Sequence, residues 1–241
     1  MSEPEPKIGI VSAMEREVAP MLRLWTRDTV AYRGRQYRVV RSRCGGKVYI
    51  ACGIGRRCAI EATEALIAAE RPQAIISAGF AGALSPAGRV GQRIAPGVVL
   101  DAETGERFFC ADGGEGVLVS APEVAGCEFK KQLALRFKAE AVDMEAAAVA
   151  RVAQMHGVAF YVVKAISDEL DFPMPPLHRF VSADGQLETA RFVAHISIRP
   201  RYWASVIRLG RNSRRARVEL CQGLERLTAE LRSRRESILR A

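Results

Sequence analysis

The segment KAEAVDMEAAAVARVAQMHGVAFYVVKAISDELD, residues 138–171, decides the fold. Its first half is rich in alanine and predicts a helix from about Glu145 to His156, which Gly157 ends. Its second half, VAFYVVKAIS, is almost continuously apolar and rich in β-branched residues, as expected of a buried parallel strand. Asp168 follows at the carboxyl end of this strand, where ligands of open α/β sheets bind. The segment therefore predicts an α/β protein with its chemistry near Asp168.

The N-terminal part of the chain predicts a first strand-to-helix junction. Residues 7–13, KIGIVSA, form an apolar strand. Ser12 stands three residues before Glu15, a capping-box spacing that favours the start of a helix running to about Trp25. Glu17 therefore lies close to the junction, where an acid can either complement the helix dipole or take part in chemistry.

Two glycine-containing segments follow later strands. A predicted hairpin of strands at 37–41 and 47–52 leads into Gly53-Ile54-Gly55, and such a turn lets backbone N–H groups approach an anion. The strand at 73–77 leads into AGFAGAL, whose small residues permit close backbone approach. A plain tight turn remains the alternative interpretation of the first segment, and a contact with a neighbouring helix that of the second.

The chain is expected to form one domain with a C-terminal extension. Residues 1–175 make up the predicted core, and residues 176–241 a helical, Arg-rich extension of the same domain. Within the extension, one apolar helix face is indicated by the spacing of Leu220, Leu224, Leu227 and Leu231.

Composition excludes several classes of protein. Hydrophobic residues make up 49% of the 241 residues, and no window is apolar enough to span a membrane. The N-terminus lacks the basic and apolar regions of a signal peptide, so we expect a cytoplasmic protein. The six cysteines show no CxxC spacing and no histidine at ligand spacing, which favours free thiols. We expect no metal and no cofactor.

The net charge of +9 is concentrated at the C-terminus. Residues 201–241 contain eleven arginines and four glutamates, a net charge of +7. This region predicts a packing or oligomer helix, and the alternatives are peripheral contact with a membrane surface and binding of nucleic acid. Because aromatic residues interleave with arginine only at Tyr202 and Trp203, we expect no specific nucleic-acid partner.

Five motifs in this order resemble the nucleoside phosphorylase superfamily. They are IGIVSAMEREV, GIG, SAGFAGAL, VDMEAAAVA and VVKAISDELD, spread over residues 7–171. The 5′-methylthioadenosine/S-adenosylhomocysteine nucleosidase branch is the most similar in pattern. The resemblance implies an α/β fold of three layers, in which helices flank a central, mixed and partly barrel-like sheet. It also implies a homo-oligomer, with a dimer expected.

The resemblance implies a role for each acid of the motifs. Glu17 matches the carboxylate that activates the attacking water, and Met144 and Glu145 match the pair that packs on the ribose and binds its hydroxyls. Ser167 and Asp168 match the pair at the purine, where the aspartate protonates N7. Protonating N7 turns an anionic purine into a neutral leaving group, a contribution of about 10²–10⁴-fold. An aspartate here also suits the 6-amino group of adenine.

The remaining expected substrate-binding residues lie in the glycine-containing segments. They are Ile54, Phe80, Ala81 and Gly82. Phe80 departs from the family pattern, which has a hydroxyl there, and this weakens the case for a phosphate site. The region between Leu100 and Gly116 is short, and no aromatic residue follows the next strand to stack on a purine.

These residues predict an enzyme that cleaves the N-glycosidic bond of a 5′-substituted adenine nucleoside with water. One alternative is cleavage by phosphate, for which Arg56, Arg57 and Arg89 are candidates. The short middle region also resembles the hopanoid-associated phosphorylase branch, which implies an adenosylated lipid as substrate. An alternative of another class is an inactive nucleotide-binding or membrane-associated scaffold.

Overall fold

The structure is a computed structural model in which residues 7–182 and 184–240 are described. Strands are interspersed with helices up to residue 168, and helices dominate after residue 170. The elements are β1 (Ile8–Ser12), α1 (Glu15–Leu22), β2 (Thr26–Tyr32), β3 (Arg35–Arg41), β4 (Lys47–Ala51), α2 (Arg56–Glu70), β5 (Ala74–Ala83), β6 (Arg93–Ile94), β7 (Val98–Asp101), β8 (Arg107–Phe109), β9 (Val117–Ser120), α3 (Cys127–Phe137), β10 (Ala141–Asp143), α4 (Ala146–Met155), β11 (Ala159–Asp168), η1 (Leu177–Phe180), α5 (Thr189–Ser197), η2 (Pro200–Tyr202) and α6 (Trp203–Arg240).

The strands form one mixed sheet that branches at β5. Its main path runs in the order β2-β3-β4-β1-β5-β10-β9-β7-β8, and β11 pairs with β5 and with the short β6. The first half of β5 lies between β1 and β11, both parallel to it, and its last residues pair with the antiparallel β10. This branching curves the sheet, so that the expected mixed and partly barrel-like arrangement is confirmed.

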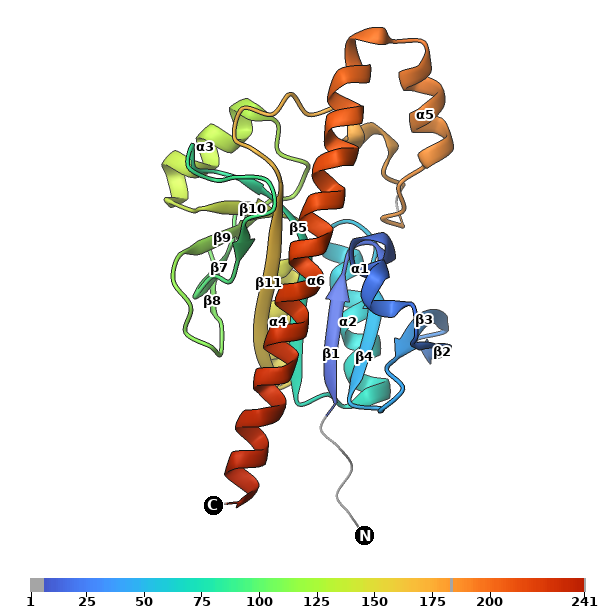
Figure 1. The fold of residues 1–241 in the computed structure, drawn as a ribbon, viewed down its shortest axis with the longest axis vertical. Coiled ribbons are helices and arrows are strands. Elements are labelled where there is room, and N and C mark those ends of the chain that lie inside the picture. The colour runs from blue at the N-terminus through green and yellow to red at the C-terminus, as the bar shows by residue number, and fades with distance from the viewer. Residues whose placement is uncertain (1–6, 183, 241) are drawn as a thin grey trace.

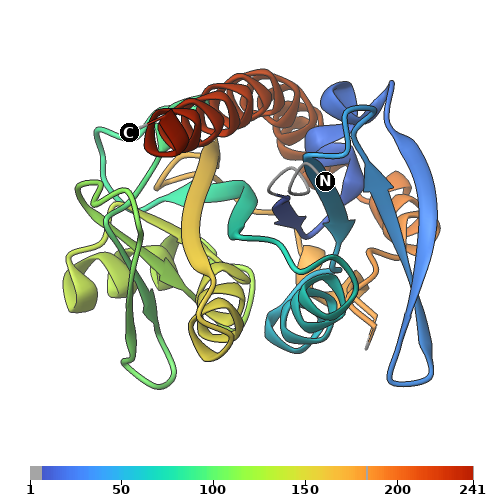
Figure 2. The same cartoon turned by 90° about the horizontal axis from the view of Figure 1, so that it is seen from below.

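Helices cover both faces of the sheet. Viewed from below, α6 lies on one face, and α2 and α4 lie on the other (Figure 2). Along β11, Phe160, Val162 and Ile166 belong to the core under α2 and α4, whereas Tyr161 and Val163 pack toward α1 and α6. A strand whose alternate side chains are buried on both faces is predominantly apolar, which explains the composition of this segment apart from Lys164.

The long helix α6 is part of the core. It crosses the face of the sheet over β11 (Figure 1), and the side chains of Leu220 and Leu224 are fully buried there. Leu227 and Leu231 are partly buried against the same cluster. The apolar face predicted from leucine spacing therefore packs on the sheet. Helix α6 shares this core with β1 and β5. The boundary at residue 175 stays a prediction.

Two local features differ from the sequence-based expectations. Strand β2 pairs antiparallel with β3 and adds a third strand to the predicted hairpin. The sequence did not predict it, because its residues are mostly polar. Strand β5 continues through the small residues up to Ala83 instead of ending at Ser77.

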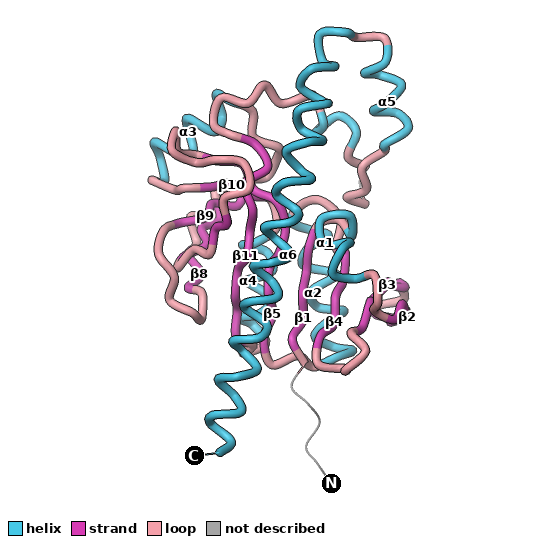
Figure 3. Tube along the Cα trace, viewed as in Figure 1, coloured by secondary structure: helices cyan, strands magenta, loops and turns pink. Residues whose placement is uncertain are grey.

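Strands and loops alternate between the helices, as the tube view shows (Figure 3). Within the described residues, no helix is both long and apolar enough to cross a bilayer.

Candidate active site

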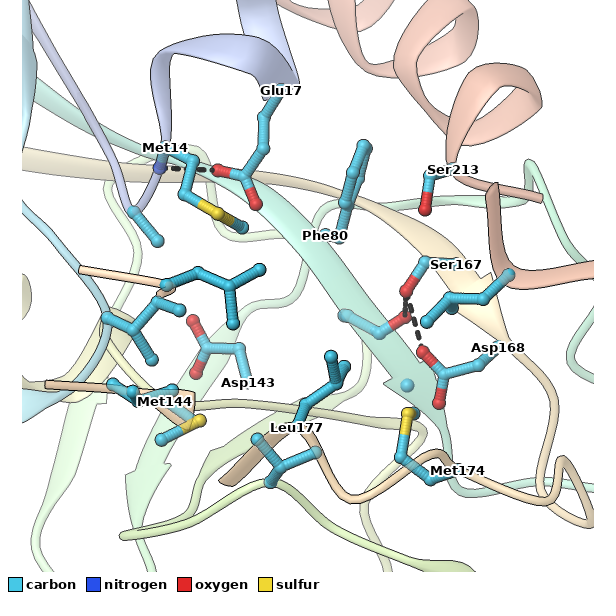
Figure 4. Close-up of a pocket in the computed structure, with 18 of the residues that line it drawn as sticks. Met14, Glu17, Phe80, Asp143, Met144, Ser167, Asp168, Met174, Leu177 and Ser213 are labelled. Carbon is cyan, nitrogen blue, oxygen red and sulfur yellow. Dashed lines mark hydrogen bonds between the residues drawn. The ribbon is translucent and has the colours of Figure 1, made fainter. Parts of the chain in front are cut away.

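A cavity of about 450 Å³ opens where β1, β5, β10 and β11 end (Figure 4). This volume lies in the range of small-molecule sites, roughly 300–1,000 Å³. The structure brings together in this one cavity all the residues predicted for the site: Glu17, Ile54, Phe80, Ala81, Gly82, Met144, Glu145, Ser167 and Asp168. Their placement agrees with a common site, and their individual roles stay predictions.

A β-bulge at Ser167 shapes the end of β11. Ile166 pairs with Ala81, and Asp168 pairs with Gly82. Ser167 between them is an extra residue that has no partner on β5. Neighbouring side chains of a regular strand point to opposite faces, and a bulge breaks this alternation. Consequently both Ser167 and Asp168 reach the cavity, where the Ser167 hydroxyl donates a 2.6 Å hydrogen bond to Oδ1 of Asp168.

Glu17 enters the cavity from α1. It is the third residue of that helix, and its Oε2 accepts a hydrogen bond of 3.2 Å from the N–H of Met14 (Figure 4). The capping box predicted for Ser12 and Glu15 is therefore wrong by two residues: the helix begins at Glu15, and Met14 with Glu17 closes the box. The hydroxyl of Ser12 instead lies 2.9 Å from that of Tyr49. Burial raises the pKa of Glu17, which the Met14 N–H only partly opposes.

Glu145 is held at the entrance to α4. Its Oε1 accepts a 2.8 Å hydrogen bond from the N–H of Gly55, whose φ of 98° favours glycine. Burial and, next, the negative charge of Asp143 raise the pKa of Glu145 to about 7, although Lys164 opposes this shift. The Gly53–Gly55 turn therefore binds a carboxylate of the protein itself.

A buried lysine that the sequence did not single out balances these acids. The ammonium of Lys164 on β11 lies 2.8 Å from Oδ2 of Asp143 and donates to the carbonyl of Ala78 at 3.3 Å. Burial opposes its charge, but the carboxylates of Asp143 and Glu145 outweigh burial and raise the pKa of Lys164. Asp143 also accepts from the hydroxyl of Ser120 at 2.6 Å and from the N–H of Ala146 at 2.9 Å. It thereby caps α4, which agrees with a structural role.

A second buried lysine, Lys130 of α3, contacts Asp168. Its ammonium forms an ion pair with Oδ2 of Asp168 and donates to the carbonyl of Glu169 at 2.8 Å. Sequence reasoning missed both lysines, because a lysine in an otherwise ordinary helix or strand carries no sign of its burial.

The C-terminal region supplies an apolar wall that was also missed. Phe80, half-buried on β5, lines the cavity between Glu17 and Ser167 (Figure 4) and so places an aromatic ring in the site. Opposite walls come from residues beyond β11, among them Met174, Leu177, Val181, Leu187, Phe192, Val206 and Leu209. Part of the cavity is therefore suited to an apolar group. Across the described residues, no cluster of histidine, cysteine or acidic side chains could hold a metal ion.

Comparison with known proteins supports one family. The family model described as the phosphorylase superfamily matches residues 7–133 and 113–197. A curated 5′-methylthioadenosine/S-adenosylhomocysteine nucleosidase of Actinobacillus succinogenes is 30% identical over 205 residues, covering 68% of this chain and 86% of that protein.

Two solved structures from Helicobacter pylori show the same fold. One is a 5′-methylthioadenosine/S-adenosylhomocysteine nucleosidase with butyl-thio-DADMe-Immucillin-A, with a TM-score of 0.66 and 21% identity over 93% of this chain and 100% of that one. The other is futalosine hydrolase, with a TM-score of 0.65 and 21% identity over 92% of this chain and 98% of that one. At this identity they bear on the fold alone. The family match and the curated relative show that the chain belongs to the phosphorylase superfamily.

Proposed function

We propose that the chain hydrolyses the N-glycosidic bond of a 5′-substituted adenine nucleoside and releases adenine. The observation that carries this proposal is the position of two carboxyl groups, Glu17 and Asp168, which enter one cavity from different elements (Figure 4). Cleavage needs one group at the sugar and another at the base, and a cavity with an acid at each end provides both.

The proposed steps follow from the chemistry of the bond. As the bond between C1′ and N9 breaks, its electron pair moves to the purine, and Asp168 gives a proton to N7. The sugar becomes oxocarbenium-like, and the negative charge of Glu17 opposes its positive charge. Glu17 takes a proton from the water that attacks C1′. Glu145 accepts hydrogen bonds from the ribose hydroxyls, and Met144 packs against the ring. No cofactor takes part in these steps.

Water is favoured over phosphate as the acceptor. The carboxylates of Glu17 and Glu145 disfavour an anion near the sugar position. The three arginines considered for phosphate do not line the cavity, whereas Arg16, Arg214 and Arg217 do. Arg56 pairs instead with Asp101 at 2.8 Å, and Arg89 donates to the carbonyl of Pro86 at 2.6 Å. Phosphorolysis therefore remains the alternative acceptor chemistry with less support.

The deciding experiment measures adenine release from methylthioadenosine, adenosylhomocysteine, adenosine and inosine, each with and without phosphate. We expect adenine from the 5′-substituted adenosines, a free sugar as the second product, and no stimulation by phosphate. Strict dependence on phosphate, with a sugar 1-phosphate as product, would contradict hydrolysis. Turnover of methylthioadenosine would place the protein in methionine salvage.

A pH dependence is expected from Glu145. Its pKa is raised to about 7, so it gains a proton below that pH and then loses acceptor capacity for the ribose hydroxyls. We therefore expect kcat/KM to rise with pH through about 7, and Glu145→Gln, which cannot titrate, to lower kcat/KM and remove this step. A profile without a step near pH 7 in the unaltered protein would contradict the role of Glu145 in binding ribose.

A second candidate substrate is an adenine nucleoside carrying a large apolar 5′ group, such as an adenosylated hopanoid lipid. The observation that favours it is the apolar wall formed by the C-terminal region, including Leu177, Phe192 and Leu209. If this wall contacts the substituent, kcat/KM should increase from a 5′-methylthio to a long 5′-alkylthio adenosine. A steady decrease with chain length would rule out this candidate.

Peripheral membrane contact is proposed for the segment at 189–218. It contains eight arginines and no acidic residue, and Val193, Ile198, Trp203 and Ile207 are exposed on it. The sequence pointed to residues 201–241 as a whole for this contact. The later part of α6 is less suited to it, because its leucine face packs on the sheet. Basic residues beside exposed apolar ones are typical of helices that bind anionic membrane surfaces.

Vesicle sedimentation tests this contact. We expect binding to phosphatidylglycerol vesicles that weakens with salt and little binding to phosphatidylcholine vesicles. The double variant Ile198→Ser with Ile207→Ser should lose binding, whereas Leu135→Ser, which changes an even more exposed leucine on α3, should keep it. Equal binding by the two variants would contradict the assignment to this segment.

Three further expectations from the sequence, namely a homodimer, a cytoplasmic location and an inactive scaffold, are also proposals. A homodimer, expected from the family, would be tested by light scattering on the eluted protein. A cytoplasmic location agrees with the six free thiols. An inactive scaffold has the least support, because superfamily membership and the shared cavity of Glu17, Glu145 and Asp168 favour an enzyme.

A further inference from the structure

Lys130 is buried beside the site without being needed to anchor its helix. Its side chain is 1% exposed, although lysine is seldom buried without a partner. The helix α3 is anchored independently: Leu133 packs in an apolar cluster, the thiol of Cys127 donates to the carbonyl of Phe172 at 3.1 Å, and Lys131 lies 3.8 Å from Asp171. Burying an ammonium costs free energy, so its presence here points to a function.

All three protons of the ammonium are directed at the end of β11. The acceptors are Oδ2 of Asp168, the carbonyl of Asp168 at 3.3 Å and the carbonyl of Glu169 at 2.8 Å. An ammonium has three donors and no acceptor. Lys130 is therefore held as a cation in one orientation, with its charge against one oxygen of Asp168.

The carboxyl group of Asp168 is fixed at both oxygens. Ser167 donates to Oδ1 at 2.6 Å, and Lys130 contacts Oδ2. Gly82 leaves the space for this arrangement, since a Cβ there would lie 2.8 Å from Cε of Lys130 and 2.9 Å from Oδ2 of Asp168. The close approach expected of the small residues in β5 is thus an approach to this ion pair.

We propose that Lys130 is a positioning residue for Asp168, which orients its carboxyl group and stabilises the carboxylate that remains after proton transfer. This inference rests on the proposed function. When the C1′–N9 bond breaks, its electron pair goes to the purine and one proton passes from Asp168 to N7. Lys130 keeps its three protons throughout, and the negative charge left on Asp168 lies against the ammonium. Asp168 regains a proton from water after adenine leaves.

Lys130 is the charged group whose contact with the Asp168 side chain can be removed selectively. The other charged side chains that line the cavity, from all the described elements around it, are Arg16, Glu17, Glu123, Asp143, Glu145, Arg214 and Arg217. Within the described residues, none of the three arginines among them forms an ion pair with Asp168, so replacing Lys130 removes a contact that none of them makes.

The test compares pH profiles of kcat/KM for adenine release. In Lys130→Met the carboxylate that remains after proton transfer loses its adjacent cation. An opposite charge at this distance typically shifts a carboxyl titration by about 1–3 units, and we expect the alkaline limb to move upward by about that amount. The charge that proton transfer leaves on Asp168 is then less stabilised, so the plateau should fall by about tenfold. Lys130→Arg, which keeps the charge, should leave the limb in place.

Two controls separate positioning from packing. Lys131→Met changes the next residue of α3, whose side chain is 47% exposed and outside the cavity, and it should leave the profile unchanged. In an Asp168→Asn background, replacing Lys130 should have no further effect on the profile, because the group through which it acts is absent.

An alkaline limb that stays in place in Lys130→Met would overturn the proposal, even if activity falls. If Lys130→Met does not fold, Lys130→Arg decides: because this variant keeps the positive charge, an alkaline limb that moves by about 1–3 units in it would equally overturn the proposal. Failure of the unaltered protein to release adenine from any nucleoside would instead contradict the proposed function, so the two failures are distinguishable.

Discussion

Replacing Asp168 with asparagine is expected to lower kcat for adenine release by about 10²–10⁴-fold. The amide keeps the shape of the side chain but has no acidic proton to give to N7, so the purine must leave as an anion. The KM should change less than kcat, because the amide can still hydrogen bond to the base. Steady-state rates at several substrate concentrations measure both. Turnover equal to that of the unaltered protein would remove Asp168 from the mechanism.

This variant needs a stability control because of Lys130. Asparagine leaves the buried ammonium without its counter-ion, and breaking a buried pair in this way typically costs about 3–5 kcal/mol. We therefore expect a lower melting temperature for Asp168→Asn. The double variant Asp168→Asn with Lys130→Met should regain stability and stay inactive, which would show that the loss of activity is chemical.

Replacing Glu17 with glutamine is expected to lower kcat by about 10²–10⁴-fold. The amide oxygen can still accept from the N–H of Met14, so α1 should keep its start, while the group that takes a proton from water is gone. The measurement is kcat with a saturating 5′-substituted adenosine, together with the circular dichroism spectrum.

Glu15→Gln is the matched control for this change. Glu15 lies two residues earlier on α1, pairs with Arg27 at 2.5 Å and does not line the active-site cavity. Its replacement should leave kcat unchanged. An equal loss in both variants would assign the effect to the helix, and retained turnover in Glu17→Gln would exclude Glu17 as the base.

The central segment could be predicted from the sequence because its signals are local. Alanine content and Gly157 indicate α4, and the apolar run indicates β11. Since both elements follow one another along the chain, the placement of Glu145 and Asp168 near one edge of the sheet follows from topology. The length of β5 was not predictable, because Gly79 and Gly82 read locally as a loop. Its pairing with three other strands keeps it extended.

The burial of the lysines of the site could not be predicted from the sequence. Lys130 and Lys131 are adjacent on α3 and identical in type, yet the first is buried and the second is exposed. Helical periodicity can separate the two faces, but not decide which face meets the end of β11. That depends on tertiary contacts such as that of Cys127 with Phe172.

The branching of the sheet at β5 has a consequence for how a substrate reaches the cavity. Opening the wall that Phe80, Ala81 and Gly82 form would break ladders to β10 and β11 together, so their amide hydrogens should exchange with solvent only on global unfolding. The opposite wall is built differently, because α5 packs chiefly on the short elements η1 and η2 and on a small cluster around Phe180. Exchange should be faster there, and entry and release of ligand are expected to proceed through that side of the molecule.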